Sequence, residues 1–178
     1  MKSNQIHQLF CGAVLIALLL VTSQPTPAGA QLIGCEYADI AFVVDSSDSI
    51  TPEFWTAVKD FLASFVNSLV IGSNAVQVGV IQYSSNAVTA FYLNAHRNNP
   101  SLVRAINNLT NIGSQTNTAA GLDMLVSDLF VQENGDRFDA PNIGIVMTDG
   151  QSNVRADDVS TSAAAVRARG TNDVHILP

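Results

Sequence analysis

Two carboxylates and three hydroxyls stand at places in the chain where they could together bind a cation. The first three belong to the segment DSSDS, residues 45–49, which follows a run of apolar residues. Alternate residues leaving a strand point the same way, so Asp45, Ser47 and Ser49 can turn three oxygens toward one point. Oxygen atoms of this kind are ligands for hard cations, and the segment has no His or Cys that would favour zinc.

A later loop and the end of a second apolar run can supply two more oxygens. Thr116 lies in the loop GSQTNTAAG, residues 113–121, and Asp149 follows the apolar segment NIGIVM. Mg²⁺ fits the combined set best, because it prefers octahedral oxygen coordination and keeps some of its water. Ca²⁺ usually takes more ligands and more carboxylates than these segments offer. We therefore predict Mg²⁺, with Mn²⁺ or Ca²⁺ as alternatives.

Each of the three segments has an ordinary structural interpretation when it is taken alone. DSSDS and the TDG of residues 148–150 are typical of turns, and residues 116–118 are typical of a helix cap. The combination favours a cation site, since all three segments are expected at the same edge of one sheet.

Strands and helices that alternate along the chain must position these segments. Continuous apolar runs at 38–44 and 142–147 predict strands buried on both faces. Residues 76–85 and 87–93 predict an antiparallel hairpin, because their connection is too short for a helix. The fold class is therefore α/β, a doubly wound, mostly parallel sheet with one antiparallel edge strand and helices on both faces. Ligands of such sheets bind outside the carboxyl ends of the strands.

The helices are predicted from apolar spacing and from their capping residues. The first opens at Thr51-Pro52-Glu53 and ends by Gly72, the second is capped by Asn99, and the others cover about 118–130 and 158–169. A last strand is predicted from residue 174. Residues expected to face the core from the first and third helices are Phe54, Val58, Phe61, Phe65, Leu69, Leu122, Leu125, Val126 and Leu129.

Composition and the N-terminus predict a secreted globular domain. The chain has 178 residues, is 47% hydrophobic and carries a formal net charge of −7, which argues against nucleic acid and anionic membranes as partners. Residues 1–30 have the layout of a signal peptide, and their apolar run, residues 11–21, is too short to span a bilayer. Residues 31–37 form a short N-terminal segment, and residues 38–178 form the domain.

Two further residues fit an extracellular protein. Cys35 would be the single cysteine of the mature chain, so its disulfide partner is expected in another chain or in sequence beyond this one. Asn108 begins the triplet Asn-Leu-Thr, which is a glycosylation acceptor.

The sequence resembles a von Willebrand factor type A domain, the I-domain fold of integrins, matrilins and microfibrillar collagens. The matching pieces are DIAFVVDSSDSI, VQVGVIQYSS, GSQTNTAAGL and IGIVMTDGQS, and the resemblance spans about residues 35–178. It implies a metal-ion-dependent adhesion site, in which Ser47, Ser49 and Thr116 contact the ion through hydroxyls. Asp45 and Asp149 would hold the ion directly or through water.

The resemblance also implies a function. Similar domains bind collagens and other matrix proteins through an Asp or Glu that completes the shell of the metal ion. The implied protein is thus a secreted adhesion or extracellular-matrix module, with self-association as a further mode of assembly.

The chain departs from the family pattern in three respects. Ser46 and Asp48 stand where the family often has glycine, and Asp48 adds negative charge beside the site. The last strand and final helix of the family are not in the sequence, so we expect an incomplete domain. By the same resemblance Cys35 would pair with a cysteine beyond Pro178.

Two other functions are weighed against adhesion. One is a structural matrix subunit that needs no metal. The other is a role in an enzyme: metal-dependent phosphoryl transfer with Asp45 as nucleophile, or a non-catalytic domain of a larger secreted protease. Phosphotransferases of similar topology carry a second acid where Ser47 stands, the chain has no phosphate-binding loop with lysine, and no G-x-S-x-G occurs. The remaining histidines, His96 and His175, are interpreted as packing or surface residues, so the sequence predicts a protein without enzymatic activity.

Overall fold

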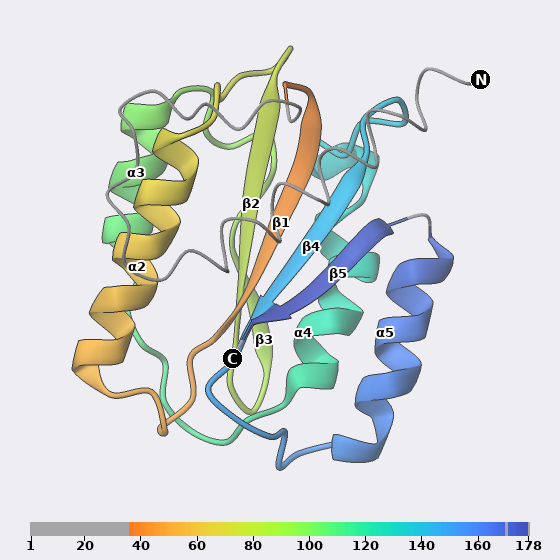
Figure 1. Ribbon diagram of the computed structural model, residues 1–178. Coiled ribbons are helices and arrows are strands. Elements are labelled where there is room, and N and C mark those ends of the chain that lie inside the picture. Colours follow the sequence, from red (N-terminus) through yellow and green to blue (C-terminus); the bar gives the residue numbers. More distant parts are fainter. Residues whose placement is uncertain (1–35, 170, 178) are drawn as a thin grey trace, which may run out of the picture.

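The fold is a central sheet with helices on both faces. The computed structural model describes residues 36–169 and the backbone of residues 171–177, so the predicted signal peptide and Cys35 lie outside the described residues. The described sheet has five strands in the order β3-β2-β1-β4-β5 (Figure 1). The strands are β1 (Ala38–Asp45), β2 (Val76–Tyr83), β3 (Ala87–Phe91), β4 (Asn142–Met147) and β5 (Thr171–Leu177). The α-helices are α2 (Pro52–Asn67), α3 (Asn99–Asn107), α4 (Thr118–Met124) and α5 (Val159–Ala168).

The strand pairing confirms the predicted fold class. Strand β1 is parallel to β2 and to β4, β4 is parallel to β5, and only the hairpin pair β2–β3 is antiparallel. Strand β3 is therefore the antiparallel edge strand that the short connection predicted. The register places Asp45 opposite Tyr83 of β2 and Val44 opposite Met147 of β4, so the three parallel strands end at one edge.

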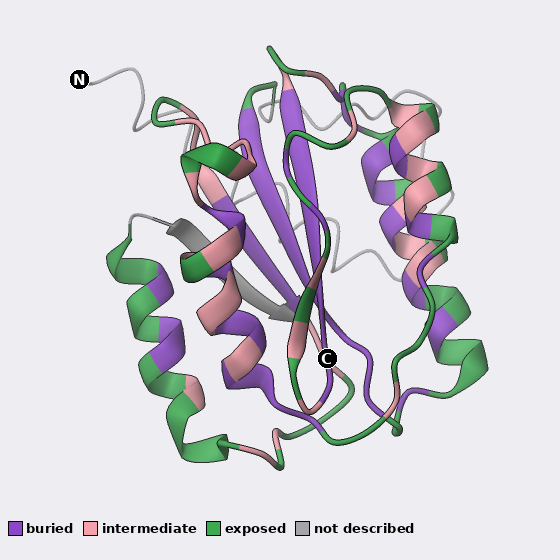
Figure 2. Cartoon of the chain, turned by 180° about the vertical axis from the view of Figure 1, so that it is seen from behind, coloured by how far each residue is buried: buried purple, intermediate pink, exposed green. Residues whose placement is uncertain are grey.

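The core has two layers, because successive side chains of a strand point to opposite faces. On β1, Phe42 and Val44 pack with residues of α2 and α3, whereas Ala41 and Val43 pack with residues of α4 and α5. Every residue of β1 is buried, which explains the apolar run at residues 40–44 between its two aspartates (Figure 2). Strand β1 is thus packed on both faces, which fixes the position of Asp45 at its end.

Helix α2 begins where the sequence predicts, but a different set of its residues faces the core. Thr51 caps it by accepting a hydrogen bond from the backbone N–H of Phe54 at 3.2 Å. The prediction that Phe54 faces the core is wrong: its side chain is 40% exposed, while the neighbouring Trp55 is buried. The Trp55 indole N–H donates to the carbonyl of Leu109, so packing against a distant segment decides the orientation. The helix ends at Asn67, before the predicted limit at Gly72.

Two other helix predictions need correction. The cap of α3 is Asn98 and not Asn99; the Asn99 amide instead donates to the carbonyls of Val66 and Leu69, at 2.6 and 3.0 Å, at the end of α2. The predicted third helix is an α-helix only as far as Met124, and residues Leu125–Leu129 continue it as a π-helix. Between residues 36 and 169, no helix is both long enough and apolar enough to cross a bilayer.

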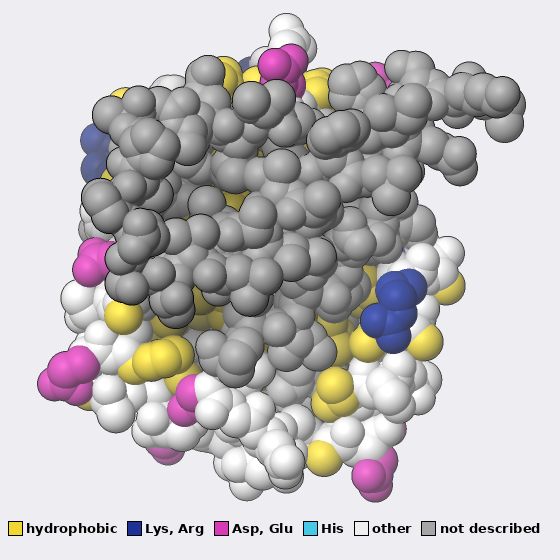
Figure 3. Space-filling model, viewed as in Figure 1, with side chains coloured by type: hydrophobic (Ala, Val, Ile, Leu, Met, Phe, Trp, Pro, Cys, Tyr) yellow, Lys and Arg dark blue, Asp and Glu magenta, His cyan; other side chains and the backbone are white. Residues whose placement is uncertain are grey.

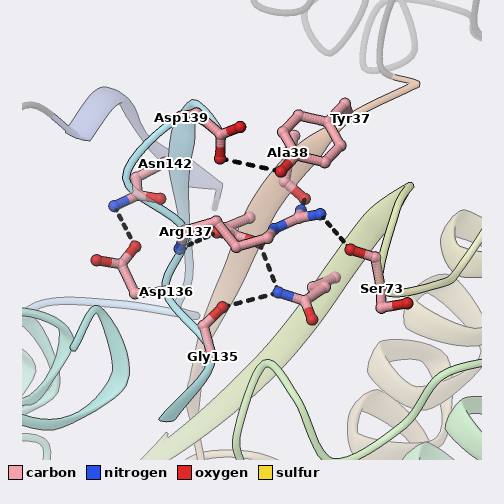
Figure 4. A network of polar contacts seen from close by, with 10 residues as sticks. Tyr37, Ala38, Ser73, Gly135, Asp136, Arg137, Asp139 and Asn142 are labelled. Carbon is pink, nitrogen blue, oxygen red and sulfur yellow. Dashed lines mark hydrogen bonds and ion pairs between the residues drawn. The ribbon is translucent and has the colours of Figure 1, made fainter. Parts of the chain in front are cut away.

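A buried ion pair fixes the start of β1, at the edge opposite Asp45 (Figure 4). Asp39 is completely buried and accepts two hydrogen bonds from the Arg137 guanidinium, at 2.7 and 2.9 Å, and one from the Arg137 backbone N–H at 2.8 Å. The guanidinium also lies over the Tyr37 ring, 4.1 Å from its centroid. The pair joins the first strand to the loop before β4.

We predict that Arg137→Met lowers the free energy of unfolding by about 3–5 kcal/mol, because it leaves the buried Asp39 carboxylate without its cation. Urea denaturation of the wild-type and variant chains measures this loss. Arg167→Met is the matched control: Arg167 is exposed on α5 and makes none of the ion pairs recorded for the described residues, so a change within about 0.5 kcal/mol is expected. Equal losses for the two variants would contradict the prediction.

Candidate metal centre

The site lies where the order of the strands reverses. From β1 the chain passes through α2 to β2 on one side, while β4 lies on the other side of β1. In open α/β sheets a crevice forms at this point, outside the carboxyl ends of the strands. Asp45 ends β1, and Thr148 and Asp149 directly follow β4. In Figure 1 this edge is the lower one.

Hydrogen bonds bring four of the five predicted residues together. The backbone N–H of Ser47 donates to Asp45 Oδ1 at 3.0 Å, which bends the chain sharply after the strand. The hydroxyl oxygens of Ser47 and Ser49 are 3.0 Å apart, and the Ser49 hydroxyl donates to Asp149 Oδ1 at 3.2 Å. The two carboxylates and two serines therefore form one continuous chain of contacts between loops that are about 100 residues apart in sequence.

Thr116 is held through its backbone against the loop that follows β4. Its N–H donates to Asn153 Oδ1 at 2.9 Å, and its carbonyl accepts from the N–H groups of Asn153 and Val154 and from the Ser152 hydroxyl, each at 3.0 Å. Its side chain is buried. The contacts recorded for residues 36–169 include no hydrogen bond of the Thr116 hydroxyl. The structure thus places the loop of Thr116 against the loop of Asp149, with the threonine hydroxyl not committed to a described partner.

The first loop and the Thr116 loop are joined as well. Gly113 N–H donates to the Ser46 carbonyl at 2.8 Å, and Asp48 N–H donates to the Ser114 carbonyl at 2.9 Å. Gly113 has φ +80°, and a Cβ there would stand 2.7 Å from a carboxylate oxygen of Asp48. A glycine is therefore needed at this position for both conformation and space. The Asp48 carboxylate lies against this loop while the residue stays exposed at the rim of the site.

The sequence interpretation missed the residues that support the first loop. Ser46, which was noticed only as a departure from glycine, donates its hydroxyl to Asn111 Oδ1 at 2.8 Å and accepts from the Ile112 N–H at 2.8 Å. The Asn111 amide donates to the carbonyls of Ser47 and Ile50. The Gln82 amide, from within β2, donates to the Ser46 hydroxyl at 3.2 Å. A serine in place of glycine was the one available signal, since a hydroxyl there needs partners.

The helix cap expected at residues 116–118 is present, and Asn117 provides it. Asn117 caps α4, because its side chain accepts from the Ala120 N–H at 3.1 Å. Neither threonine is required for this function. The Thr116 side chain is therefore available for a function other than capping the helix.

The electrostatics of the site favour a cation. Asp45 is only 2% exposed, and the hydrogen bonds to its side chain come from neutral groups, the Ser47 N–H and the Thr148 hydroxyl at 3.1 Å. None of the ion pairs recorded for the described residues involves Asp45, Asp48 or Asp149. Buried charges in proteins are paired or coordinate metals. A buried carboxylate without a basic partner, linked through two serines to the exposed Asp149, fits a metal ion.

Tyr83 adds a neutral polar group beneath Asp45. Its phenol oxygen is buried and has no hydrogen-bond partner among the described residues. Burial first, and then the charge of Asp45, raises the pKa of Tyr83, so the phenol stays protonated at physiological pH. It therefore adds no further charge to the site.

The donor set itself consists of hydroxyl and carboxylate oxygens. Among the described residues, no three His, Cys, Asp or Glu side chains are gathered as metal ligands, so a cation held here would take hydroxyl oxygens as well as carboxylates. Such oxygens suit Mg²⁺, Mn²⁺ or Ca²⁺. The residues present thus fit the group that the sequence predicts.

Comparison with known proteins identifies the family. The model of the von Willebrand factor type A domain matches residues 39–176, and the chain belongs to this family. It is 35% identical over 80% of its length to vitrin of Mus musculus, 33% identical over 87% to matrilin-1 of Gallus gallus, and 35% identical over 85% to the collagen alpha-4(VI) chain of Mus musculus. It spans 21%, 33% and 6% of those proteins, respectively.

A solved structure gives the same fold. Proximal thread matrix protein 1 from the mussel byssus superposes with a TM-score of 0.73 at 31% identity, over 80% of this chain and 38% of that one. Another structure of that protein is described as having a zinc-occupied MIDAS motif. The family resemblance seen in the sequence is therefore confirmed, and zinc occupies the MIDAS motif of a relative.

Tight packing of α4 on the sheet positions the loop of Thr116. A Cβ at Gly121 would meet Val43 Cγ1 at 2.7 Å and Tyr83 Cδ1 at 3.0 Å. We predict that Gly121→Ala destabilises the chain by about 1–2 kcal/mol, because overpacking outweighs the gain in helix propensity of about 1 kcal/mol.

Thermal or urea unfolding checks this prediction. Gly150→Ala is the control, since a Cβ at Gly150 has no heavy atom within 4 Å, and a change within about 0.5 kcal/mol is expected. A Gly121→Ala variant as stable as the wild type would show that the helix can move away from β1.

Proposed function

We propose that the chain is a secreted adhesion or extracellular-matrix module that binds partner proteins through a Mg²⁺ bridge to an acidic residue of the partner. The observation that carries this proposal is the buried Asp45 carboxylate, which has neutral hydrogen-bond donors and no basic partner. The relatives named for collagen and for a thread matrix support the setting in the extracellular matrix.

The five predicted residues would have different roles in metal binding, according to their exposure. Asp45 and Ser47 are buried and would hold the ion from the protein side, with Thr116 beside them, while Ser49 and Asp149 are exposed and would form the rim. When bound, Mg²⁺ supplies a partly neutralised positive charge that accepts a carboxylate oxygen from another protein. The exposed rim leaves the outer side accessible to an Asp or Glu of that partner. Zinc is recorded in the motif of the mussel relative, and Mn²⁺ or Ca²⁺ would suit the same oxygens.

The arrangement also supports a protein without catalytic activity. His96 follows β3, the strand that runs away from the site, and its ring packs edge-on against Phe91 with centroids 5.1 Å apart. Burial lowers the pKa of His96, so it is neutral at physiological pH. Ser47 stands where a phosphotransferase would need its second acid. The described site thus offers carboxylates and hydroxyls that suit cation binding, and His96 takes no part in it.

We predict that binding of the secreted chain to immobilised collagens requires both a divalent cation and Asp149. Addition of EDTA to the Mg²⁺-containing buffer, or the substitution Asp149→Ala, is expected to lower affinity at least as much as the 10–100-fold loss typical of outer-shell ligand partners. Surface plasmon resonance with and without chelator measures the effect.

Asp60→Ala is the matched control, because it removes the same charge from an exposed position of α2 that makes no recorded hydrogen bond or ion pair. It should bind like the wild type. Binding that is unchanged by EDTA and by Asp149→Ala would favour the alternative, a structural matrix subunit that self-associates without metal. Absence of binding to collagens alone, with a measurable Mg²⁺ affinity, would redirect the search to other acidic partners.

A further inference from the structure

The acceptor triplet Asn108-Leu109-Thr110 is the one sequence motif that the metal site does not use. It is the only Asn-X-Ser/Thr triplet in the sequence whose middle residue is not proline, since Asn99-Pro100-Ser101 is excluded by Pro100. An asparagine that carries a glycan must be exposed, and its side-chain amide nitrogen must make no hydrogen bond that the fold needs. Asn108 meets both conditions among the described residues.

Asn108 is exposed immediately after the last residue of α3. Its backbone N–H is bonded to the carbonyls of Arg104 and Ala105, both at 3.2 Å, so the backbone is fixed. The hydrogen bonds recorded for residues 36–169 involve neither the Asn108 side chain nor the Thr110 hydroxyl. The residue between them, Leu109, is 8% exposed, and its carbonyl accepts from the Trp55 indole N–H at 3.3 Å. The triplet is thus anchored at its middle, with both recognised side chains outside the fold.

Other asparagines nearby show the opposite arrangement. The Asn99 amide is bonded to two carbonyls of the segment that ends α2, the Asn111 amide supports the first loop of the metal site, and the Asn117 amide donates to the Ser85 carbonyl at 3.0 Å. A sugar on any of these nitrogens would break contacts of the fold. A sugar on Asn108 breaks none of those recorded.

We propose that Asn108 carries an N-linked glycan, attached as the chain enters the secretory pathway, and that this glycan covers the flank of the metal site next to α2 and α3. In the transfer, Asn108 Nδ2 bonds to the anomeric carbon of a lipid-linked oligosaccharide. The bond from that carbon to the pyrophosphate breaks, the lipid pyrophosphate leaves, and Nδ2 gives up one proton. The glycan does not depend on a bound metal, so this inference and the proposed function can fail separately.

The place of the glycan follows from the chain geometry. Asn111 contacts the first loop directly and is three residues from Asn108, so the two Cα atoms are at most about 11 Å apart. On the other side, Lys59 Nζ donates to the Asn107 carbonyl at 3.3 Å. A glycan on Asn108 therefore stands over Lys59 and beside the metal site, and a partner must approach from the side of the loop that follows β4.

The test is expression of the full chain in cells with a secretory pathway. We expect the secreted wild type to lose the mass of one oligosaccharide on treatment with peptide N-glycosidase, with conversion of Asn108 to Asp in the corresponding peptide. Asn108→Gln and Thr110→Ala should each lack the oligosaccharide. Asn107→Gln, a substitution one residue outside the triplet, should retain it.

Acylation of Lys59 tests the place of the glycan. Lys59 is the only lysine after Lys2, so an amine-reactive reagent read by peptide mass spectrometry reports on this one side chain. Labelling should be several-fold slower in the glycosylated wild type than in the same protein after enzymatic removal of the sugar. Wild type that is secreted without an oligosaccharide, or that is never translocated, would overturn the proposal; equal labelling rates would overturn the position of the glycan.

Discussion

The proposed binding function depends on one buried carboxylate, that of Asp45. Asp45 is buried at the end of the central strand, receives hydrogen bonds only from neutral groups, and has no basic side chain to balance it among the described ion pairs. A charge in that position is costly unless a cation joins it. At the opposite end of the same strand, Arg137 neutralises the buried Asp39 carboxylate. The two ends of β1 thus differ: Asp39 is paired within the fold, whereas Asp45 has no basic partner among the recorded ion pairs and is the carboxylate that we propose as a cation ligand.

The surrounding fold serves to keep three loops together at that carboxylate. Core packing on both faces fixes β1, the close contact at Gly121 sets α4 against the sheet, and backbone hydrogen bonds tie the Thr116 loop to both neighbours. Figure 3 shows separate acidic side chains along the lower and left margins and at the top of the molecule, in keeping with the formal net charge of −7. Such a surface accepts cations and disfavours anionic membranes.

The sequence predicted the parts of this structure that depend on local pattern. Mostly apolar runs predicted β1 and β4, the short connection predicted the hairpin, and the positions after those runs predicted Asp45 and Asp149 at strand ends. What it missed depends on contacts between distant segments. The indole of Trp55 reaches Leu109 and turns α2, Asn99 bonds to the end of α2 and leaves Asn98 as the cap, and Ser46 and Asn111 meet across 65 residues. Residue spacing does not predict these contacts, because Asn98 and Asn99 have the same local propensity as caps and the other pairs meet only in the folded chain.

The most direct measurement of the central claim is a Mn²⁺ titration of the isotope-labelled chain followed by NMR. Because Mn²⁺ is paramagnetic, it broadens the amide signals of residues close to it, and it can replace Mg²⁺ at oxygen ligands. The account predicts that the signals of Ser47, Thr116 and Asp149 broaden together at low ion concentration, and that excess Mg²⁺ restores them, while Ser73 and Arg137 at the opposite edge stay sharp. Broadening that spares any one of the three loops, or that spreads evenly over the acidic surface, would contradict a single metal centre at Asp45.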